Sequence, residues 1–190
     1  MFDWQRLAQN SLRTGAVASA TTTLAAAACG ALERRSALGP INAVSHIAWG
    51  DRAAHQDRPS LRYSLTGLIL NTAAVTSWAA LHEICFGRTM HRDAAPGARI
   101  ASSLLGGVFV SALAYVTDYK FVPRRLTPGF ELRLSDRSLL GIYTALAVGL
   151  GLGGLLGEPA SKAARATATP RPPRRSSPRR SRQTVSHKPR

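Results

Sequence analysis

Hydrophobic positions in this chain form four long runs, each with almost no charged side chain. The runs cover about residues 14–32, 63–85, 100–118 and 139–157. A helix rises about 1.5 Å per residue, so each run is about as long as the hydrocarbon core of a bilayer is thick, roughly 30 Å. The pattern therefore predicts an all-α integral membrane protein, a four-helix bundle whose transmembrane domain covers residues 14–157.

The segments between the runs also carry structural signals. Residues 1–13 are polar with two aromatic residues, which is typical of a membrane interface. After the first run, the stretch PINAVSHIAWGD predicts a short helix that begins at Pro40 and lies along the interface. Two prolines and Gly129 after the third run predict a turn-rich connection, with Ser135 capping the last helix.

The first run has an alternative interpretation as a cleaved signal peptide. Arg6 and Arg13 precede it, and small residues near Cys29 resemble a cleavage site. Three further runs downstream, and Asp3 in the charged region, favour retention as a transmembrane span.

Small residues recur at every fourth position in three of the runs. This spacing places them on one helix face, where a second helix can approach closely. We expect that packing within the chain uses these faces, and self-association into a homo-oligomer through the last face is the alternative. The three sets are Gly15, Ser19, Thr23, Ala27 and Ala31; Ser103, Gly107 and Ser111; and Gly149, Gly153 and Gly157.

Charge is distributed unevenly along the chain. The formal net charge is +15, and ten of the 25 Lys and Arg residues lie in the last 31 residues, which contain no acid. Segment 158–190 is rich in Arg, Pro and Ser, so we expect it to be disordered. It lacks aromatic residues that could stack on bases, which disfavours nucleic acid and favours anionic lipid headgroups as its partner.

The charges also predict an orientation. Four spans place both termini and the second loop on one side of the membrane, and this side holds more Lys and Arg than the side with the first and third loops. The positive-inside rule then favours cytoplasmic termini. The excess comes from the tail, because without it the comparison reverses.

Four polar residues in the first and third loops could meet, since those loops lie on the same side. They are His46, Asp51, Asp118 and Glu131. A histidine with carboxylates could relay protons or bind a metal. The simpler interpretation is a polar cap paired with neighbouring arginines, and no zinc-ligand spacing is present, so we predict no metal site.

Three polar residues lie within the second run. Asn71 is near its middle, where an amide needs a hydrogen-bonding partner, so we expect it to face the other helices. His82 and Glu83 lie in its last turn. Ionisable groups in a span are functional candidates, but at this depth we expect them to reach the headgroups.

No phosphate-binding loop, nucleophile elbow or metalloprotease motif is present, and no cofactor is predicted. We therefore predict a non-catalytic structural or accessory component of a membrane. A transporter or channel subunit is the first alternative. A membrane-embedded enzyme that uses His46 with Asp51 or Asp118 is the second.

Several stretches together resemble a family of small four-span inner-membrane proteins of proteobacteria. They are PINAVSHIAWGD, WAALHE, DYKFVPRRLTPGFELRLS and YTALAVGLGLG. The likeness covers roughly residues 12–157 and leaves out the basic tail. It implies a four-span protein of a bacterial inner membrane, and it implies no activity, cofactor or catalytic residue.

Overall fold

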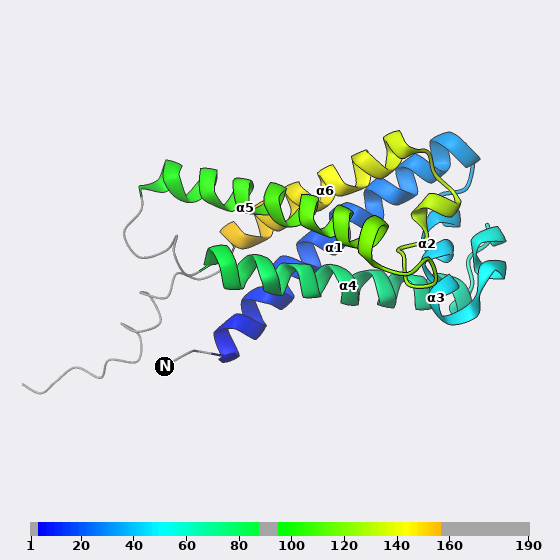
Figure 1. The fold of residues 1–190 in the computed structure, drawn as a ribbon, viewed down its shortest axis with the longest axis horizontal. Coiled ribbons are helices and arrows are strands. Elements are labelled where there is room, and N and C mark those ends of the chain that lie inside the picture. Colours follow the sequence, from blue (N-terminus) through cyan, green and yellow to red (C-terminus); the bar gives the residue numbers. More distant parts are fainter. Residues whose placement is uncertain (1–3, 88–94, 157–190) are drawn as a thin grey trace, which may run out of the picture.

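The computed structural model describes residues 4–87 and 95–156, and every regular element among them is a helix. Four helical segments are long and apolar enough to cross a membrane, namely Trp4–Arg34, Leu61–Gly87, Pro96–Phe121 and Asp136–Leu155. Figure 1 shows these segments running side by side, with the short helices gathered at one end. The prediction of an all-helical chain with four long apolar helices is confirmed.

The four long segments are built from α-helices and short π-helical turns. They comprise α1 (Trp4–Arg34), α4 (Thr66–His82) between the π turns η2 (Leu61–Leu65) and η3 (Glu83–Gly87), α5 (Pro96–Val116) followed by the π turn η4 (Thr117–Phe121), and α6 (Asp136–Leu155). Helix α1 runs without a break from Trp4, so residues 4–13 belong to the same helix as the first apolar run. The predicted tail, 158–190, lies outside the described residues.

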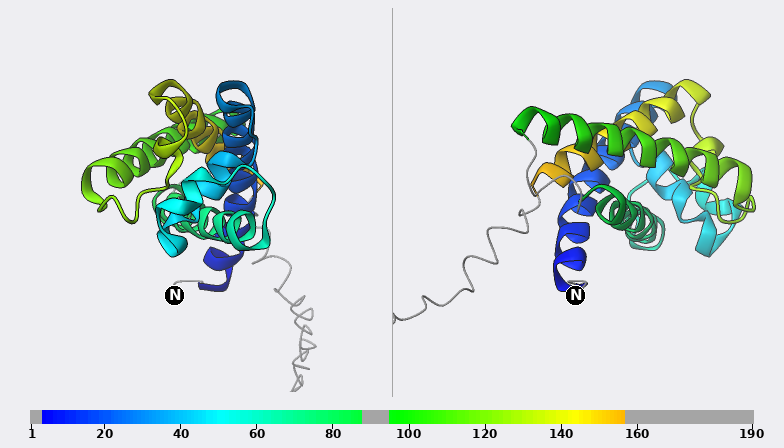
Figure 2. Two further views of the ribbon diagram at one scale, coloured as in Figure 1. Left: turned by 90° about the vertical axis from the view of Figure 1, so that its right-hand side faces the viewer. Right: turned by 60° about the vertical axis from the view of Figure 1, so that its left-hand side comes forward.

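Helices α1 and α6 lie at the centre of the arrangement. Helix α1 packs against α4 on one side and α6 on the other, and α6 also packs against α5. The two further views in Figure 2 show α1 (blue) crossing its neighbours obliquely. The buried apolar residues along these contacts are mostly small or aliphatic, with Tyr143 the one aromatic member of the larger cluster.

The small residues predicted to allow close approach do so within the chain. In α5, the hydroxyl of Ser103 donates to the backbone carbonyl oxygen of Gly151 at 2.8 Å, and the hydroxyl of Ser111 donates to the backbone carbonyl oxygen of Tyr143 at 2.5 Å. Gly107 lies between them, with its Cα facing the α6 backbone so closely that a Cβ would overlap it. Helices α5 and α6 therefore meet at backbone distance.

The first small-residue face of α1 lies against α4. A Cβ at Gly15 would lie 2.6 Å from the hydroxyl oxygen of Thr76, and the hydroxyls of Ser19 and Thr72 are 2.9 Å apart. Ala31, at the far end of the predicted face, is exposed and takes no part. Hydrogen bonds between hydroxyls thus supplement the packing of small side chains at this interface.

The first loop folds differently from the prediction. It contains α2 (Gly39–Val44), α3 (His46–Trp49) and the 3₁₀ helix η1 (Asp51–His55). A short helix containing Pro40 in its first turn is present, but every residue of α2 is buried, so it is not an amphipathic helix on a surface. It packs against α1 and α4, and Gly67 of α4 makes room for the backbone of Ile41.

The third loop contains the predicted turn and cap. Gly129 adopts a left-handed conformation (φ +84°), which favours glycine, and the 3₁₀ helix η5 (Phe130–Leu132) follows. The hydroxyl of Ser135 accepts a hydrogen bond from the backbone N–H of Ser138 and caps α6 as expected. Helix α2 contacts η5, so the first and third loops meet at one end of the molecule.

Candidate functional site

Two carboxylates and two tyrosines meet at the loop end of the helices. The hydroxyl of Tyr143 on α6 donates to Asp118 Oδ2 at 2.6 Å, and that of Tyr119 on η4 donates to Glu131 at 3.4 Å. Thr127 also donates a hydrogen bond to Glu131. These contacts connect η4, α6 and η5. Of the four residues predicted to cluster here, the structure brings Asp118 and Glu131 together.

Aromatic packing holds this network in place. The rings of Tyr115, Tyr119 and Tyr143 contact one another, with centroids 5.1 to 5.9 Å apart. Aromatic pairs at these separations and tilted angles are mutually stabilising. The π turn η4 carries both Asp118 and Tyr119, so its unusual backbone directs two polar side chains toward α6 and η5.

The other two predicted members of the cluster lie elsewhere. His46 is buried, with Nδ1 2.9 Å from the carbonyl oxygen of Ala43 and Nε2 3.4 Å from that of Arg124. Asp51 is exposed at the start of η1. Across the described ranges, no hydrogen bond or ion pair links His46 to Asp51, Asp118 or Glu131. The predicted polar cap therefore contains Asp118 and Glu131 but not His46 or Asp51. The ring nitrogens of His46 face backbone carbonyl oxygens instead.

A second polar cluster lies at the opposite end of the helices, where α4 passes into η3. His82 is 2% exposed and Glu83 is 4% exposed. The hydroxyl of Thr14 on α1 donates to Glu83 Oε1 at 2.9 Å, and His82 Nε2 lies 3.2 Å from the carbonyl oxygen of Ser103 on α5. Both side chains therefore point into the helix contacts.

This burial contradicts the expectation that His82 and Glu83 reach the headgroup level. Their position in the last turn of the second run suggested an exposed helix end. The helix instead continues through η3, and α1 extends past this depth because it begins at Trp4. Thr14 of α1 and the Ser103 backbone of α5 contact Glu83 and His82 and help to cover the pair.

Asn71 and the glycines of α6 face neighbouring helices, as the sequence predicts. Asn71 is buried and donates to the hydroxyl of Thr23 on α1 at 3.3 Å, which confirms that it faces the other helices. Gly149 and Gly153 of α6 lie against Ala18 and Thr14 of α1. The glycine face thus packs within the chain, as expected. Gly157, its third predicted member, lies outside the described residues.

Three functional side chains were not singled out as chemical groups by the sequence. Ser103 counted only as a small residue, and Thr14 and Tyr143 were passed over inside the first and fourth runs. Tyr143 is the one aromatic residue in that run, a signal that could have drawn attention to it. Thr14 and Ser103 have no such signal, because their roles depend on where α4 ends.

An open groove of about 440 Å³ lies beside the first loop. Apolar side chains dominate its lining, which comes from α1, the first loop, η2 and α4 and includes Leu38, Ile41, Leu61, Leu65 and Leu68. It offers few polar groups for chemistry. In the part of the chain that the structure describes, no three His, Cys, Asp or Glu side chains lie close enough to hold a metal ion.

Comparison with protein-family models, curated proteins and solved structures gave no match to this chain. The resemblance to proteobacterial inner-membrane proteins therefore stays a prediction. The chemistry of the chain must be inferred from its own two buried polar clusters.

Proposed function

We propose that this chain is a multi-pass protein of a bacterial inner membrane and crosses the bilayer four times. One observation carries the proposal: on α1, α4 and α5, large apolar side chains lie mostly outside, and most of the buried residues are small or polar. On α5, Leu105 and Phe109 are 68% and 59% exposed, whereas the buried positions include Ser103, Gly107 and Ser111. Helix α1 buries nothing larger than threonine and exposes Leu24 at 70%.

This distribution is the reverse of the one that water favours. In a soluble protein, large apolar residues would fill the core and leave no broad apolar surface. In lipid, the outward face is solvated by acyl chains, and small residues let helices approach closely. The exposed apolar faces of α4, α5 and α6 therefore need hydrocarbon as their solvent.

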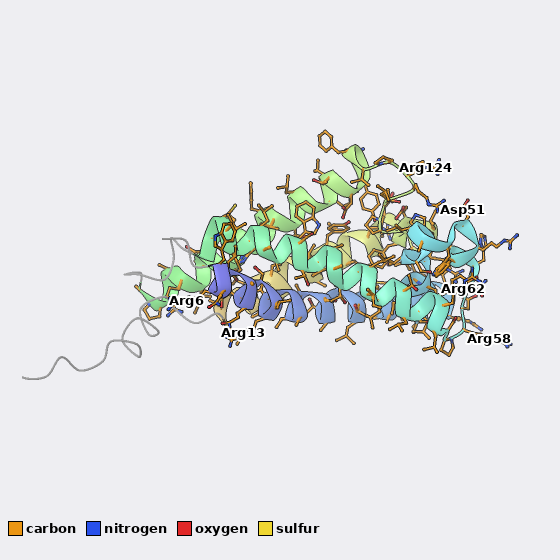
Figure 3. All side chains as sticks on the ribbon, turned by 90° about the horizontal axis from the view of Figure 1, so that it is seen from below. Arg6, Arg13, Asp51, Arg58, Arg62 and Arg124 are labelled. Atoms are coloured by element: carbon orange, nitrogen blue, oxygen red, sulfur yellow. The ribbon has the colours of Figure 1, made fainter. Side chains whose placement is uncertain are left out.

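The positions of charged side chains support the same proposal. Figure 3 shows Arg6 and Arg13 toward one end of the helices and Asp51, Arg58, Arg62 and Arg124 at the other. The α1 stretch between Arg13 and Glu33 contains no charge. The charged residues thus border an apolar belt about as thick as a bilayer core, roughly 30 Å.

We assign the protein a structural or accessory role without catalysis of its own. The support is the closed interior: α6 meets α1 and α5 at backbone distance through Gly149, Gly153 and Gly107. A transporter or channel subunit is the second candidate, and the buried pair His82 and Glu83 favours it. The enzyme hypothesis loses its basis, because His46 does not meet Asp51 or Asp118.

The proposal extends to the partners of the chain. The bilayer is the main one, and the basic segment after residue 157 would bind anionic headgroups on the cytoplasmic side. Self-association would have to use a face other than Gly149 and Gly153, since α1 covers both. Cross-linking of the full chain in membranes would detect such a homo-oligomer.

Topology mapping tests the proposal directly. Reporters active on opposite sides of the membrane are fused after Asp57, Asp93, Asp136 and Arg190, and membrane association is tested by a carbonate wash. We expect Asp57 and Asp136 to report the periplasm, and Asp93 and Arg190 the cytoplasm. If Asp57 and Asp93 report the same side, the second span does not cross and the proposal fails.

A further inference from the structure

The buried pair at the junction of α4 and η3 has an unsatisfied group. Nδ1 of His82 is buried and has no hydrogen-bond partner among the described residues. It faces Glu83, whose Oε1 is 3.9 Å away. This separation is longer than a hydrogen bond, and a side-chain movement of about 1 Å or one bridging water molecule would close it.

The other ring nitrogen determines which tautomer is present. Nε2 of His82 lies 3.2 Å from the carbonyl oxygen of Ser103, and a carbonyl oxygen can only accept. Nε2 therefore carries a hydrogen. In the neutral ring, Nδ1 then presents a lone pair toward Glu83.

Glu83 is arranged to carry either a charge or a proton. Its Oε1 accepts the hydrogen bond of Thr14 at 2.9 Å, which stabilises a carboxylate. A neutral imidazole and an ionised carboxylate would leave two lone pairs facing each other and one uncompensated buried charge. One added proton resolves both problems, because it makes the pair neutral as imidazolium with carboxylate or as imidazole with carboxylic acid.

The helices around His82 and Glu83 leave space for the His82 ring. A Cβ at Gly154 would lie 2.7 Å from His82 Cε1, and one at Gly106 would lie 3.1 Å from His82 Nε2. Glycines on α5 and α6 thus make room for the imidazole ring. Glu83 begins a π turn, a backbone irregularity that often marks functional positions in helices.

Other charged groups at this end of the molecule come from each neighbouring helix. Helix α5 brings Arg99 one turn before Ser103, half-buried and with its Nε unpartnered. Helix α1 brings Arg13, which is exposed, and η3 carries the exposed Cys85. The described part of α6 brings no charged side chain to this end.

We propose that His82 and Glu83 form a proton-binding site, which takes up one exchangeable proton from the solvent at the Arg13 end of the helices. The site holds a single proton between the imidazole and the carboxylate, and loses it to water when the solution becomes alkaline. Such a site would let protonation bias how α1, α4 and α5 pack at this end. It does not depend on which membrane the chain occupies.

Infrared difference spectroscopy of the full chain in lipid vesicles tests this directly. Spectra are compared between about pH 5 and pH 9, the range in which histidine commonly titrates. Beside the bands of the other four histidines, we expect a carboxyl band and the imidazole bands of His82 to change together over one transition, as coupled groups do. Both changes should be lost in Glu83→Gln and in His82→Gln. The matched control, Asp118→Asn, removes a half-buried carboxyl at the other end and should retain both.

Three results would overturn the proposal: no pH-dependent carboxyl and imidazole bands that the two variants lose, such bands changing at different pH values, or a full signal in Glu83→Gln. If the variants fail to fold, ¹⁵N-histidine NMR of the unmodified chain decides. A pH-dependent Nδ1 signal assigned to His82, as distinct from the buried His46, supports the site, and a pH-independent His82 signal refutes it. Neither measurement reports membrane insertion, so failure of the proton-site proposal can be distinguished from failure of the proposed topology.

Discussion

Adding one methyl group to Gly153 should separate α1 from α6. A Cβ at this position would lie 2.7 Å from Thr14 Cα and 3.0 Å from the Thr14 carbonyl oxygen. Both atoms belong to the α1 backbone, so no rotamer change can relieve the overlap. Carbon atoms pack at about 3.5–4.0 Å, so the helices must move apart by about 1 Å.

The free-energy cost of this overlap can be measured against a matched control in the same helix. A Cβ at Gly141 meets no atom within 4 Å. Gly→Ala gains up to about 1 kcal/mol of helix propensity at either position, whereas overpacking typically costs about 1–3 kcal/mol. Because the propensity gain cancels between the two variants, Gly153→Ala should be less stable than Gly141→Ala by about 1–3 kcal/mol.

The assay is reversible unfolding of the purified chain in a mild detergent titrated with dodecyl sulfate. Tryptophan fluorescence reports the transition, since Trp78 packs against the main core cluster. The free energy of unfolding is compared among the unmodified chain, Gly153→Ala and Gly141→Ala. Equal stability of the two variants would refute the conclusion that α1 and α6 meet at backbone distance here.

Three further changes test other contacts. Ser111→Ala removes the hydrogen bond to the Tyr143 carbonyl and should lower the free energy of unfolding by about 0.5–1.5 kcal/mol in the same assay; no loss would mean that the bond is not formed. Gly67→Ala should displace α2, because its Cβ would overlap the Ile41 carbonyl, and hydrogen exchange at residues 42–45 should accelerate. Glu33 lies in the exposed last turn of α1, beyond the apolar run 14–32, and hydrogen bonds from serines at the start of α6 hold its pKa at about 2, below the ordinary 4.5. A carboxyl whose pKa is lower in the folded than in the unfolded state stabilises the folded chain above pH 4.5, and this stabilisation is lost as the pH falls toward 2. The difference in free energy of unfolding between the unmodified chain and Glu33→Gln should therefore shrink between pH 4.5 and pH 2 in unfolding titrations; a pH-independent difference would contradict this.

The sequence predicted the contacts that depend on local periodicity. Spacing of four placed Ser103, Gly107 and Ser111 on one face of α5, and all three meet α6. Burial of Asn71 followed from the cost of leaving an amide unpaired in an apolar run. Capping by Ser135 followed from residue chemistry at a helix start. Each of these depends on residues within a few turns of one helix.

The sequence could not predict features that depend on where distant segments end. Exposure of His82 and Glu83 was expected because the apolar run stops there. The structure buries them, because Thr14 of α1 and Ser103 of α5 contact them and α4 continues through a π turn. In the same way, α2 has an amphipathic pattern but is buried on all sides, since Gly67 admits its backbone against α4.

The sequence by itself determined the helices of this protein: four apolar runs of bilayer length, the small-residue faces along them and the charged residues that border them. These are local quantities, set by residue type and a period of about 3.6 residues. Only the tertiary structure decided which polar groups meet. Asp118 pairs with Tyr143 rather than His46, and Thr14 reaches Glu83, because hydrogen bonds across 25 and 69 residues depend on how helices are positioned in space.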